Sequence, residues 1–434
     1  MSTSDGSAQF EARAADWLSV EEAMGRILRR VRPLDAESVP LDGADGRVLA
    51  EPLVANATLP PWSNSAMDGY AVRAADIARA TPSSPAHLRV AGRVWAGHTE
   101  TVRVPPRGAV RIMTGAPLPP GADTVVKVED TDQEAHGGHV LVTAAVERGR
   151  YVRPAGEDMR VGQTVLEAGR TVTAGVTGLA AALGRNRLTV HRRPRVALIA
   201  TGDELRPPER YDDVVKGKGI PESNTPMLAA MVRGAGGDPG ERRIAGDDEE
   251  DLAAHLSDAA YADVLVTIGG ASMGEADLVK RVLDRAGFRQ DFWRVRLRPG
   301  SPFSFGLLPR EDALQPVFGL PGNPASAFVT FELFVRPFLR SSAGHEARFR
   351  PRLRCVAGED LRGPTDLTAY LRVSLDRTSE PPTAHLTGPQ GSGLVSGLAL
   401  ADGLAILPPG TGSIGREEVV DVLLLDGNAT DEYR

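Results

Sequence analysis

The chain has 434 residues, enough for about three domains of roughly 150 residues, and it is 41% hydrophobic and 25% charged. Its 57 acidic residues exceed its 50 Lys and Arg, and no basic stripe stands out, so nucleic acid is not expected as a partner. No apolar stretch reaches the roughly 18 residues that span a bilayer, so no membrane association is expected. Cys355 is the only cysteine, which excludes an internal disulfide and a multi-cysteine zinc site and fits a reducing cytoplasm.

The first half of the chain begins with residues 1–15, which read as a disordered tail. Apolar residues then recur at helical spacing over 17–32, with Ser19 as N-cap and Glu22 completing a capping box. Residues 51–151 contain short β-type runs split by Pro and Gly, which predict an inserted β domain. A helix is expected near 174–183. We therefore expect an elongated N-terminal helical and linker domain made from 16–50 and 152–190.

Residues 191–342 change to a pattern of apolar strands followed by helices. Buried-strand runs occupy 195–200, 263–268 and 317–320, and continuous apolar strands of this kind favour a central doubly wound parallel-sheet α/β domain. After about residue 343 the chain returns to short β runs, so a small C-terminal β domain is expected over 343–434. The predicted fold class is therefore multidomain, α/β and β.

Three loops follow the expected strands: TGDEL (201–205), GGASMGEAD (269–277) and GLPGNPAS (319–326). In a doubly wound sheet the ligand crevice lies beyond the carboxyl ends of the strands. Gly269, Gly270 and Gly274 let backbone N–H groups approach an anion closely. Any one loop could be only a tight connection, but three at one sheet edge favour a ligand site.

Carboxylates gather near the same edge, namely Asp203, Glu204, Asp247, Asp248, Glu275 and Asp277. Magnesium prefers oxygen ligands and often uses one or two carboxylates together with substrate phosphates. Acids at helix starts can instead complement the helix dipole, which is the favoured interpretation of Asp248 and Glu275. Glu204 and Asp277 each stand just past a strand end, which favours a functional role.

The sequence Gly270-Ala-Ser272-Met-Gly274 satisfies GxSxG between a strand and a helix, the context of a nucleophile elbow. A serine hydrolase using Ser272 would also need a downstream acid and histidine. Only His345 and His385 follow, beyond the parallel-sheet segment, so this reading is much the weaker alternative.

Six segments follow one another along the chain: NSAMDGYAVR (64–73), RIMTGAP (111–117), GED (156–158), ATGDEL (200–205), GEAD (274–277) and GLPGNPAS (319–326). In this order they resemble the MoeA family of molybdopterin molybdenumtransferases, which includes the gephyrin E domain. The resemblance covers nearly the whole chain from about Trp17. It implies an enzyme of molybdenum cofactor biosynthesis, which converts adenylylated molybdopterin and molybdate, with Mg2+, into molybdenum cofactor and AMP.

The resemblance also implies a cytoplasmic homodimer, with the active cleft between the α/β domain of one subunit and the β insertion of the other. The adenylyltransferase that supplies the substrate and the apo-molybdoenzymes that receive the product are implied as further partners. Cleaving a phosphoanhydride needs charge neutralisation and positioning more than a covalent nucleophile, which agrees with a site rich in carboxylates and glycine loops.

The residues and the resemblance together give three sets of candidate site residues. The catalytic candidates are Asp68, Thr114, Asp158, Glu204 and Asp277, and the magnesium candidates are Glu204, Asp247 and Asp277. The substrate-binding candidates are Gly269, Gly270, Ser272, Gly274, Arg294, Arg298, Ser301, Pro321, Gly322, Asn323, Pro324 and Ser392.

Four positions depart from the family pattern. Arg294 and Arg298 stand where lysines are usual, Ser301 replaces another lysine, and Glu222 replaces an aspartate. A guanidinium fork does not bind an oxyanion as an ammonium does. The departures leave a second hypothesis open, a pterin-binding paralogue with reduced or altered catalysis.

Overall fold

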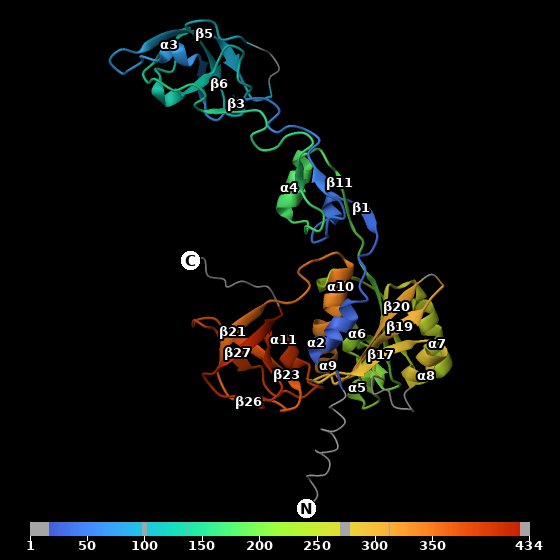
Figure 1. Ribbon diagram of the computed structural model, residues 1–434. Helices are drawn as coiled ribbons and strands as arrows, with labels where there is room; N and C mark the ends of the chain where they lie inside the picture. Colours follow the sequence, from blue (N-terminus) through green and yellow to red (C-terminus); the bar gives the residue numbers. More distant parts are fainter. Residues whose placement is uncertain (1–16, 98–101, 136, 270–277, 312, 426–434) are drawn as a thin grey trace, which may run out of the picture. The chain divides into compact units, whose positions relative to one another are not determined.

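The computed structural model describes residues 17–97, 102–135, 137–269, 278–311 and 313–425. They divide into two compact units (Figure 1). Unit 1 holds the described residues of 1–50, 169–174 and 187–434, and unit 2 holds those of 51–168 and 175–186. No helix in the described part of the chain is both long and apolar enough to cross a bilayer.

Unit 1 is built around a six-stranded sheet. Its strands, in spatial order, are β15 (Asp238–Ala245), β12 (Arg195–Thr201), β16 (Val264–Ile268), β20 (Leu314–Leu320), β19 (Pro302–Pro309) and β17 (Arg289–Arg294). The first four are parallel, which confirms the predicted parallel sheet, whereas β19 and β17 extend it antiparallel.

The register of these strands aligns their ends. Thr201 lies opposite Ala245, and Ile268 lies opposite both Ala200 and Leu320. The four parallel strands therefore finish together, at an edge that we call the carboxyl edge.

Helices cover both faces of this sheet, as predicted (Figure 1). One face packs against α2 (Val20–Leu28), α6 (Asn224–Gly234), α9 (Pro324–Thr330) and α10 (Arg336–Ser342), and the other against α7 (Glu249–Asp258) and α8 (Leu278–Arg285). Val196 and Leu198 of β12 join the first core, and Ala197, between them, joins the second. This alternation is the period of two that a strand imposes, and each buried Val or Leu contributes about 1.5–3 kcal/mol.

Phenylalanines concentrate in the first of these cores, although aromatic residues make up only 5% of the chain. Phe303 of β19 stacks on Phe334 with ring centroids 4.5 Å apart, and Phe318 of β20 meets Phe338 edge-on at 5.4 Å. Phe334 belongs to a π-helical turn, η5 (Phe331–Val335), which joins α9 to α10. Each such pair adds about 0.5–1.5 kcal/mol beyond burial, so the rings fix α9 and α10 on the sheet.

Helix α2 shows the predicted capping box. Ser19 Oγ accepts from the Glu22 N–H at 3.1 Å, and Glu22 Oε2 accepts from the Ser19 N–H at 2.8 Å. The helix is shorter than the predicted 17–32, because it begins after this cap and ends at Leu28. Its buried residues belong to the core of the α/β sheet.

The C-terminal part of unit 1 is a β structure, as predicted. Its sheet has the order β18 (Leu297–Arg298), β23 (Thr368–Asp376), β24 (Thr383–Leu386), β21 (Arg352–Ala357), β27 (Val419–Leu424) and β25 (Gly403–Leu407). Pairing of β23 with β25 closes the sheet into a barrel. Strand β18 joins β23 in parallel, which ties the barrel to the chain just after β17.

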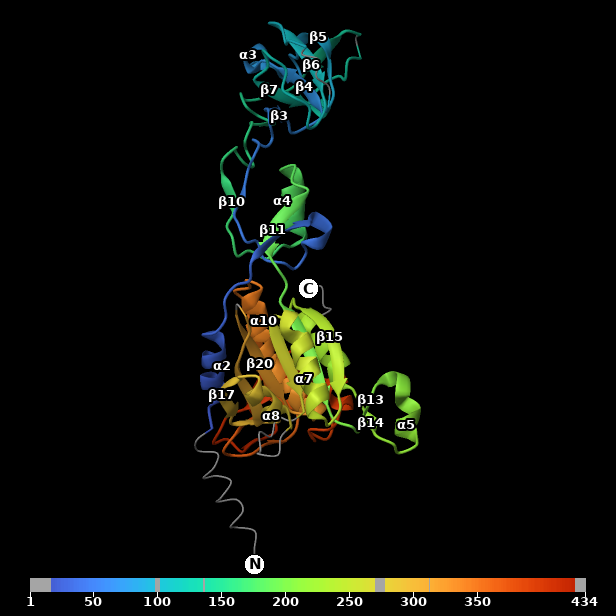
Figure 2. The ribbon, with the colours of Figure 1, turned by 90° about the vertical axis from the view of Figure 1, so that its right-hand side faces the viewer.

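Three small ribbons among the described residues also belong to unit 1, and one of them pairs β22 (Leu361–Arg362) antiparallel with β26 (Ser413–Ile414). Strand β1 (Ala36–Pro40) pairs antiparallel with β11 (Arg187–His191) and leads into β12. After β12, the chain forms β13 (Leu205–Arg206) and β14 (Ile220–Pro221) with α5 (Tyr211–Val215) between them, to one side of the sheet (Figure 2).

Unit 2 contains a five-stranded β sheet, in agreement with the predicted insertion. The order is β7 (Thr124–Lys127), β4 (Gly69–Val72), β6 (Gly108–Ile112), β5 (Ala86–Val94) and β8 (His139–Val142). The other elements include β3 (Asn64–Ser65) paired with β9 (Val152–Arg153), β2 (Leu53–Val54) paired with β10 (Thr164–Leu166), α3 (Ala74–Ile77) and α4 (Ala174–Ala182). The expected four-domain boundaries stay a prediction.

The capping box gives a first test. Ser19→Ala should destabilise α2 by about 0.5–2 kcal/mol, because the N–H of Glu22 loses its acceptor. Faster amide hydrogen exchange within 20–28 would report this loss. Ser19→Asp keeps an acceptor and should retain near-normal protection; equal exchange in all three proteins would show that the cap contributes nothing.

Candidate active site at the carboxyl edge

The loops after β16 and β20 meet at the carboxyl edge. The N–H of Gly269 donates to the Leu320 carbonyl at 3.1 Å, and a Cβ on Gly322 would lie 3.7 Å from the Gly269 Cα. The Asn224 side chain, at the start of α6, donates to the Gly322 carbonyl at 2.7 Å. Two of the three predicted loops are therefore in direct contact, with α6 supporting them.

Two glycines at this edge have a backbone conformation that would strain any side chain. Gly269 has φ +91°, and a Cβ there would lie 2.9 Å from Thr201 Oγ1 at the end of β12. Gly202 has φ +145°, and its Cβ would lie 2.6 Å from Glu204 Oε2. Glycine is therefore required at both positions. The second contact also places the exposed Glu204 carboxylate over the end of β12.

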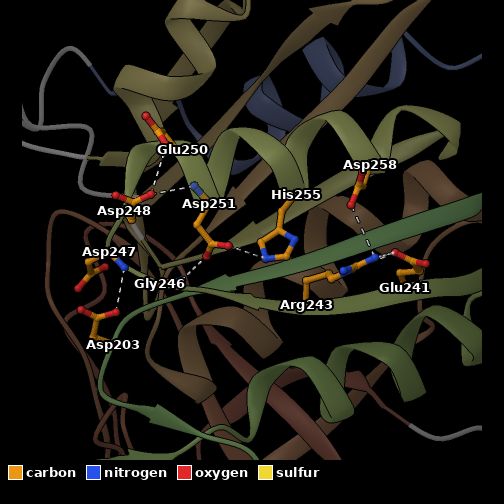
Figure 3. A network of polar contacts seen from close by, with 10 residues as sticks. All are labelled: Asp203, Glu241, Arg243, Gly246, Asp247, Asp248, Glu250, Asp251, His255 and Asp258. Atoms are coloured by element: carbon orange, nitrogen blue, oxygen red, sulfur yellow. Dashed lines mark hydrogen bonds and ion pairs between the residues drawn. The ribbon is translucent and has the colours of Figure 1, made fainter.

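The acids at this edge are of two kinds: Asp248 caps a helix, whereas Asp247 leaves its carboxylate exposed (Figure 3). Asp248 caps α7 by accepting from the N–H groups of Glu250 and Asp251, both at 2.9 Å, which confirms its helix-start role. Asp203 accepts from the Asp247 N–H at 3.1 Å. Figure 3 shows Asp203 and Asp247 side by side, and the side chain of Asp247 is exposed.

Glu204 and Asp247 are thus the described magnesium candidates at this edge. The described residues contain no group of three or more His, Cys, Asp or Glu placed to hold a metal ion. Gly270, Ser272, Gly274, Glu275 and Asp277 lie outside the described residues.

The predicted 321–324 loop meets the C-terminal barrel. Asn323 is the N-cap of α9 and Pro324 is its first residue. The N–H of Ala325 donates to the Ser392 carbonyl at 2.9 Å, and a Cβ on Gly393 would lie 3.8 Å from Asn323 Oδ1. The segment of Ser392 and Gly393 therefore lies beside Asn323 and the start of α9.

The arginine-containing turn 295–301 lies at the same edge. Arg294 pairs with Pro302 between β17 and β19, and Ser304 pairs with Gly319 near the end of β20. Since β17 ends and β19 begins where β20 ends, the turn between them is brought to the carboxyl edge.

The side chains of this turn differ in how they are used. The Arg294 guanidinium lies 3.9 Å from the ring centroid of Trp293 and 4.8 Å from that of Trp17. Ser301 Oγ donates to the Leu297 carbonyl. Arg298 is exposed. Of the three lysine replacements, Arg294 and Ser301 thus contact their own chain, and Arg298 is open to a ligand.

Arg372 is a residue that the sequence analysis missed. It is fully buried in β23, and its Nη2 donates to the carbonyls of Pro389 at 2.9 Å and Gly391 at 3.2 Å. Its Nε and Nη1 have no partner in the described part of the chain. Burial lowers its pKa. Arg372 therefore holds the loop that contains Ser392, and an arginine within the apolar run TAYLRVSL was the signal that could have revealed it.

Glu222 also has a structural explanation. Its buried carboxylate accepts from the Thr225 N–H at 2.8 Å and from Thr225 Oγ1 at 2.6 Å. These bonds satisfy the first turn of α6, beside the Asn224 that holds the 321–324 loop. The departure at Glu222 therefore builds the start of a helix that supports the site.

In unit 2, the structure brings two predicted residues together. Asp68 Oδ1 accepts from the Thr114 N–H at 2.7 Å and from Thr114 Oγ1 at 2.8 Å. These two bonds, the backbone one foremost, lower the pKa of the exposed Asp68. The exposed Asp158 follows β9, and its N–H donates to the Leu59 carbonyl at 3.2 Å. Asp68 and Thr114 thus form one polar pair on the surface of unit 2.

Three family models match this chain: "MoeA N-terminal region (domain I and II)" over residues 18–184, "Probable molybdopterin binding domain" over 197–341, and "MoeA C-terminal region (domain IV)" over 354–425. "Molybdopterin molybdenumtransferase 2" of Mycobacterium tuberculosis is 39% identical, covering 93% of this chain and 95% of its own. "Molybdopterin molybdenumtransferase" of Synechococcus elongatus is 35% identical, covering 93% and 99%. The crystal structure of a molybdopterin biosynthesis MoeA protein from Pyrococcus horikoshii superposes with TM-score 0.79 at 30% identity, covering 95% of this chain and 100% of that one.

The Asp68–Thr114 pair gives a second test. Thr114→Val removes the hydroxyl but keeps the backbone donor, so the pKa of Asp68 should rise part of the way toward its ordinary value. A carboxyl 13C NMR titration would measure it, with Thr114→Ser as the hydroxyl-retaining control.

The sign of the linked stability follows from the lowered pKa. Asp68 stabilises the folded state at pH values above its unfolded pKa, and this stabilisation is lost as the pH falls through the folded pKa. On acidification, Thr114→Val should therefore lose less stability than the wild type. If the pKa of Asp68 is the same in Thr114→Val as in the wild type, the Thr114 hydroxyl does not contribute to lowering it.

Proposed function

The chain belongs to the MoeA family of molybdopterin molybdenumtransferases and is a transferase of molybdenum cofactor biosynthesis, and on this premise we propose that it inserts molybdenum from molybdate into adenylylated molybdopterin with release of AMP. The observation that carries the proposal is the gathering at the carboxyl edge of Glu204, Asp247, the 321–324 loop and the Ser392 loop. These groups come from elements far apart in the sequence but end at one face of the sheet.

The substrates are anions, so the site must hold negative charge. Arg298 is exposed at the edge, and the two unpaired donors of Arg372 lie behind the Ser392 loop. Phosphoanhydride cleavage depends on placing such charges where the leaving phosphate develops its own. We assign Arg298 to binding an oxyanion group of the substrates, and Arg372 to holding the loop that contacts them.

The residues at the edge also fit magnesium. Glu204 and Asp247 offer exposed carboxylate oxygens, and Asp277 follows Gly269 in the chain. Magnesium is commonly held by one or two carboxylates with substrate phosphates completing its coordination, which agrees with so small a donor set. When bound, the ion would neutralise charge on the diphosphate that releases AMP.

No protein thiolate is required for this reaction, because the dithiolene sulfurs of the pterin hold the transferred metal. Cys355 is buried in the core of the C-terminal barrel, and burial raises its pKa. Its placement in this core is consistent with a packing role, away from the reaction.

The two alternatives have less support. The relatives named as transferases favour an active enzyme over the paralogue hypothesis. The hydrolase hypothesis needs a histidine near Ser272, whose loop begins at Gly269 on the carboxyl edge. His345, however, lies in a cavity with Arg193 and Gly236, which precede β12 and β15 and so belong to the opposite edge. His385, on β24, belongs to the C-terminal barrel.

We extend the proposal to Asp68, Thr114 and Asp158 of unit 2, which would complete the site of a second subunit in a homodimer. The proposal also includes a cytoplasmic location, delivery of the substrate by an adenylyltransferase and transfer of the product to apo-molybdoenzymes. The support is the family relationship and the exposure of all three side chains.

The proposal predicts that Glu204→Gln, Asp247→Asn and Asp277→Asn each lower magnesium-dependent AMP release at least about tenfold, because each removes a carboxylate charge from the diphosphate site. Melting temperatures should stay near that of the wild type, since Glu204 and Asp247 are exposed. Glu209→Gln, in the exposed turn before α5, is the matched control. The helix-dipole interpretation of Asp277 gives the opposite pattern, a stability loss of roughly 0.3–1 kcal/mol with near-normal activity.

The homodimer predicts complementation between inactive chains. In a 1:1 mixture, half of the dimers combine Asp68→Asn with Glu204→Gln, and each such dimer has one intact site built from two subunits. About a quarter of wild-type activity should therefore return. Subunits are exchanged or co-expressed, and light scattering checks the mass. A monomeric protein, or a mixture as inactive as either parent, would contradict the shared site.

A further inference from the structure

The cavity beside His345 lies at the edge of the sheet opposite the carboxyl edge. Its volume is about 280 Å³, and it is lined by Arg47, Arg193, Arg233, Arg340 and His345 among others. Arg193 lies just before β12, Arg233 lies near the end of α6, and His345 follows α10. Groups from four separate segments of unit 1 therefore surround one small space, which we call the arginine cavity.

Positive charge dominates this cavity. Asp45 is the only carboxylate among its described lining residues. Arg47 is already paired with Glu37 and donates to the His191 carbonyl at 2.8 Å. Arg340 Nε donates to a backbone carbonyl, that of Ala347, at 2.8 Å.

The exposed Arg193 and Arg233 have no carboxylate partner in the parts of the chain that the structure describes. Arg336, which lies near His345, is already paired with Glu332 at 3.7 Å, and Glu332 also pairs with Arg350 at 3.0 Å. Local carboxylates therefore leave the arginines of the cavity without full compensation.

His345 adds a buried group that has no partner. It is only 7% exposed, and its Nδ1 makes no hydrogen bond within the described residues. Its Nε2 faces Gly236, another lining residue, and a Cβ added to Gly236 would lie 3.6 Å from this nitrogen. Burial, with Arg340 and Arg336 nearby, lowers the pKa of His345 to about 4, so its ring is neutral at pH 7. A neutral imidazole can donate one hydrogen bond to a ligand without adding charge.

The size and shape of the donors limit the ligand. The cavity, at about 280 Å³, lies at the lower limit of the roughly 300–1,000 Å³ of drug-sized ligand sites, and a small ion fits within it. Guanidinium groups present paired N–H donors that match the oxygens of a tetrahedral oxyanion.

We propose that the arginine cavity binds a tetrahedral oxyanion dianion, the chemistry that phosphate, sulfate and molybdate share. The proposal does not depend on the reaction at the carboxyl edge. A bound dianion contacts the segment after β1, the link between β11 and β12, and the ends of α6 and α10. Because it binds only when these segments are folded together, it stabilises the folded unit 1.

The test is isothermal titration of the full-length protein with phosphate, sulfate and molybdate in separate arms, in a buffer free of these anions. At least one anion should bind saturably. Arg233→Gln should weaken it at least about tenfold, because a charge-assisted hydrogen bond is lost. Arg233 is exposed, so this variant is expected to fold. Arg233→Lys should retain part of the affinity.

Two control variants locate the ion. Arg30→Gln changes a separate basic pocket and should leave the affinity unchanged, whereas Arg298→Gln changes the carboxyl edge and should leave in place the binding that Arg233→Gln weakens. In the wild type, the NMR resonances of the His345 ring should shift over the same range of anion concentration as the calorimetric binding. In Arg233→Gln, this shift should be lost. Absence of saturable binding would overturn the proposal, as would an affinity that depends on Arg298 and not on Arg233.

Discussion

The parallel register of β15, β12, β16 and β20 is the constraint on which the rest of unit 1 depends. It ends the strands at Ala245, Thr201, Ile268 and Leu320 together, so the loops that follow must share one edge. A slip of one residue would exchange the side chains that face α6 with those that face α7 and α8, and the hydrophobic cores on both faces resist it. The contact between Gly269 and Thr201 depends on the same alignment, because a Cβ on Gly269 would meet the Thr201 side chain.

A second layer of organisation comes from the C-terminal barrel. Strand β18 pairs with β23, and this pairing fixes the arginine-containing turn 295–301 against the barrel. Arg372, in the same β23, holds the loop of Ser392 against the start of α9. A buried cation without a carboxylate is costly, so Arg372 depends on the Pro389 and Gly391 carbonyls that accept from its Nη2. The barrel thus contributes to the site although its own core is apolar and separate.

The two edges of the α/β sheet carry opposite chemistry. Glycines, exposed acids and the exposed Arg298 occupy the carboxyl edge, while arginines with few carboxylates gather at the other edge in the arginine cavity. The net charge of −7 conceals this separation, because a sum over the chain does not record which charges the fold brings together. Electrostatic interactions at distances beyond about 10 Å are largely screened, so each edge can act on its own ligands.

The sequence by itself determined the features that depend on local pattern. These include the alternation of strands and helices in 191–342, the capping box of Ser19 and Glu22, and the role of Asp248 at the start of α7. Tertiary structure decided what distant residues meet: the antiparallel β17 and β19, the stacking of Arg294 on Trp17, the burial of Arg372, and the convergence of Arg47, Arg233 and His345. The physical reason is that capping and periodicity act over a few residues, whereas burial and charge pairing depend on which segments pack together in space.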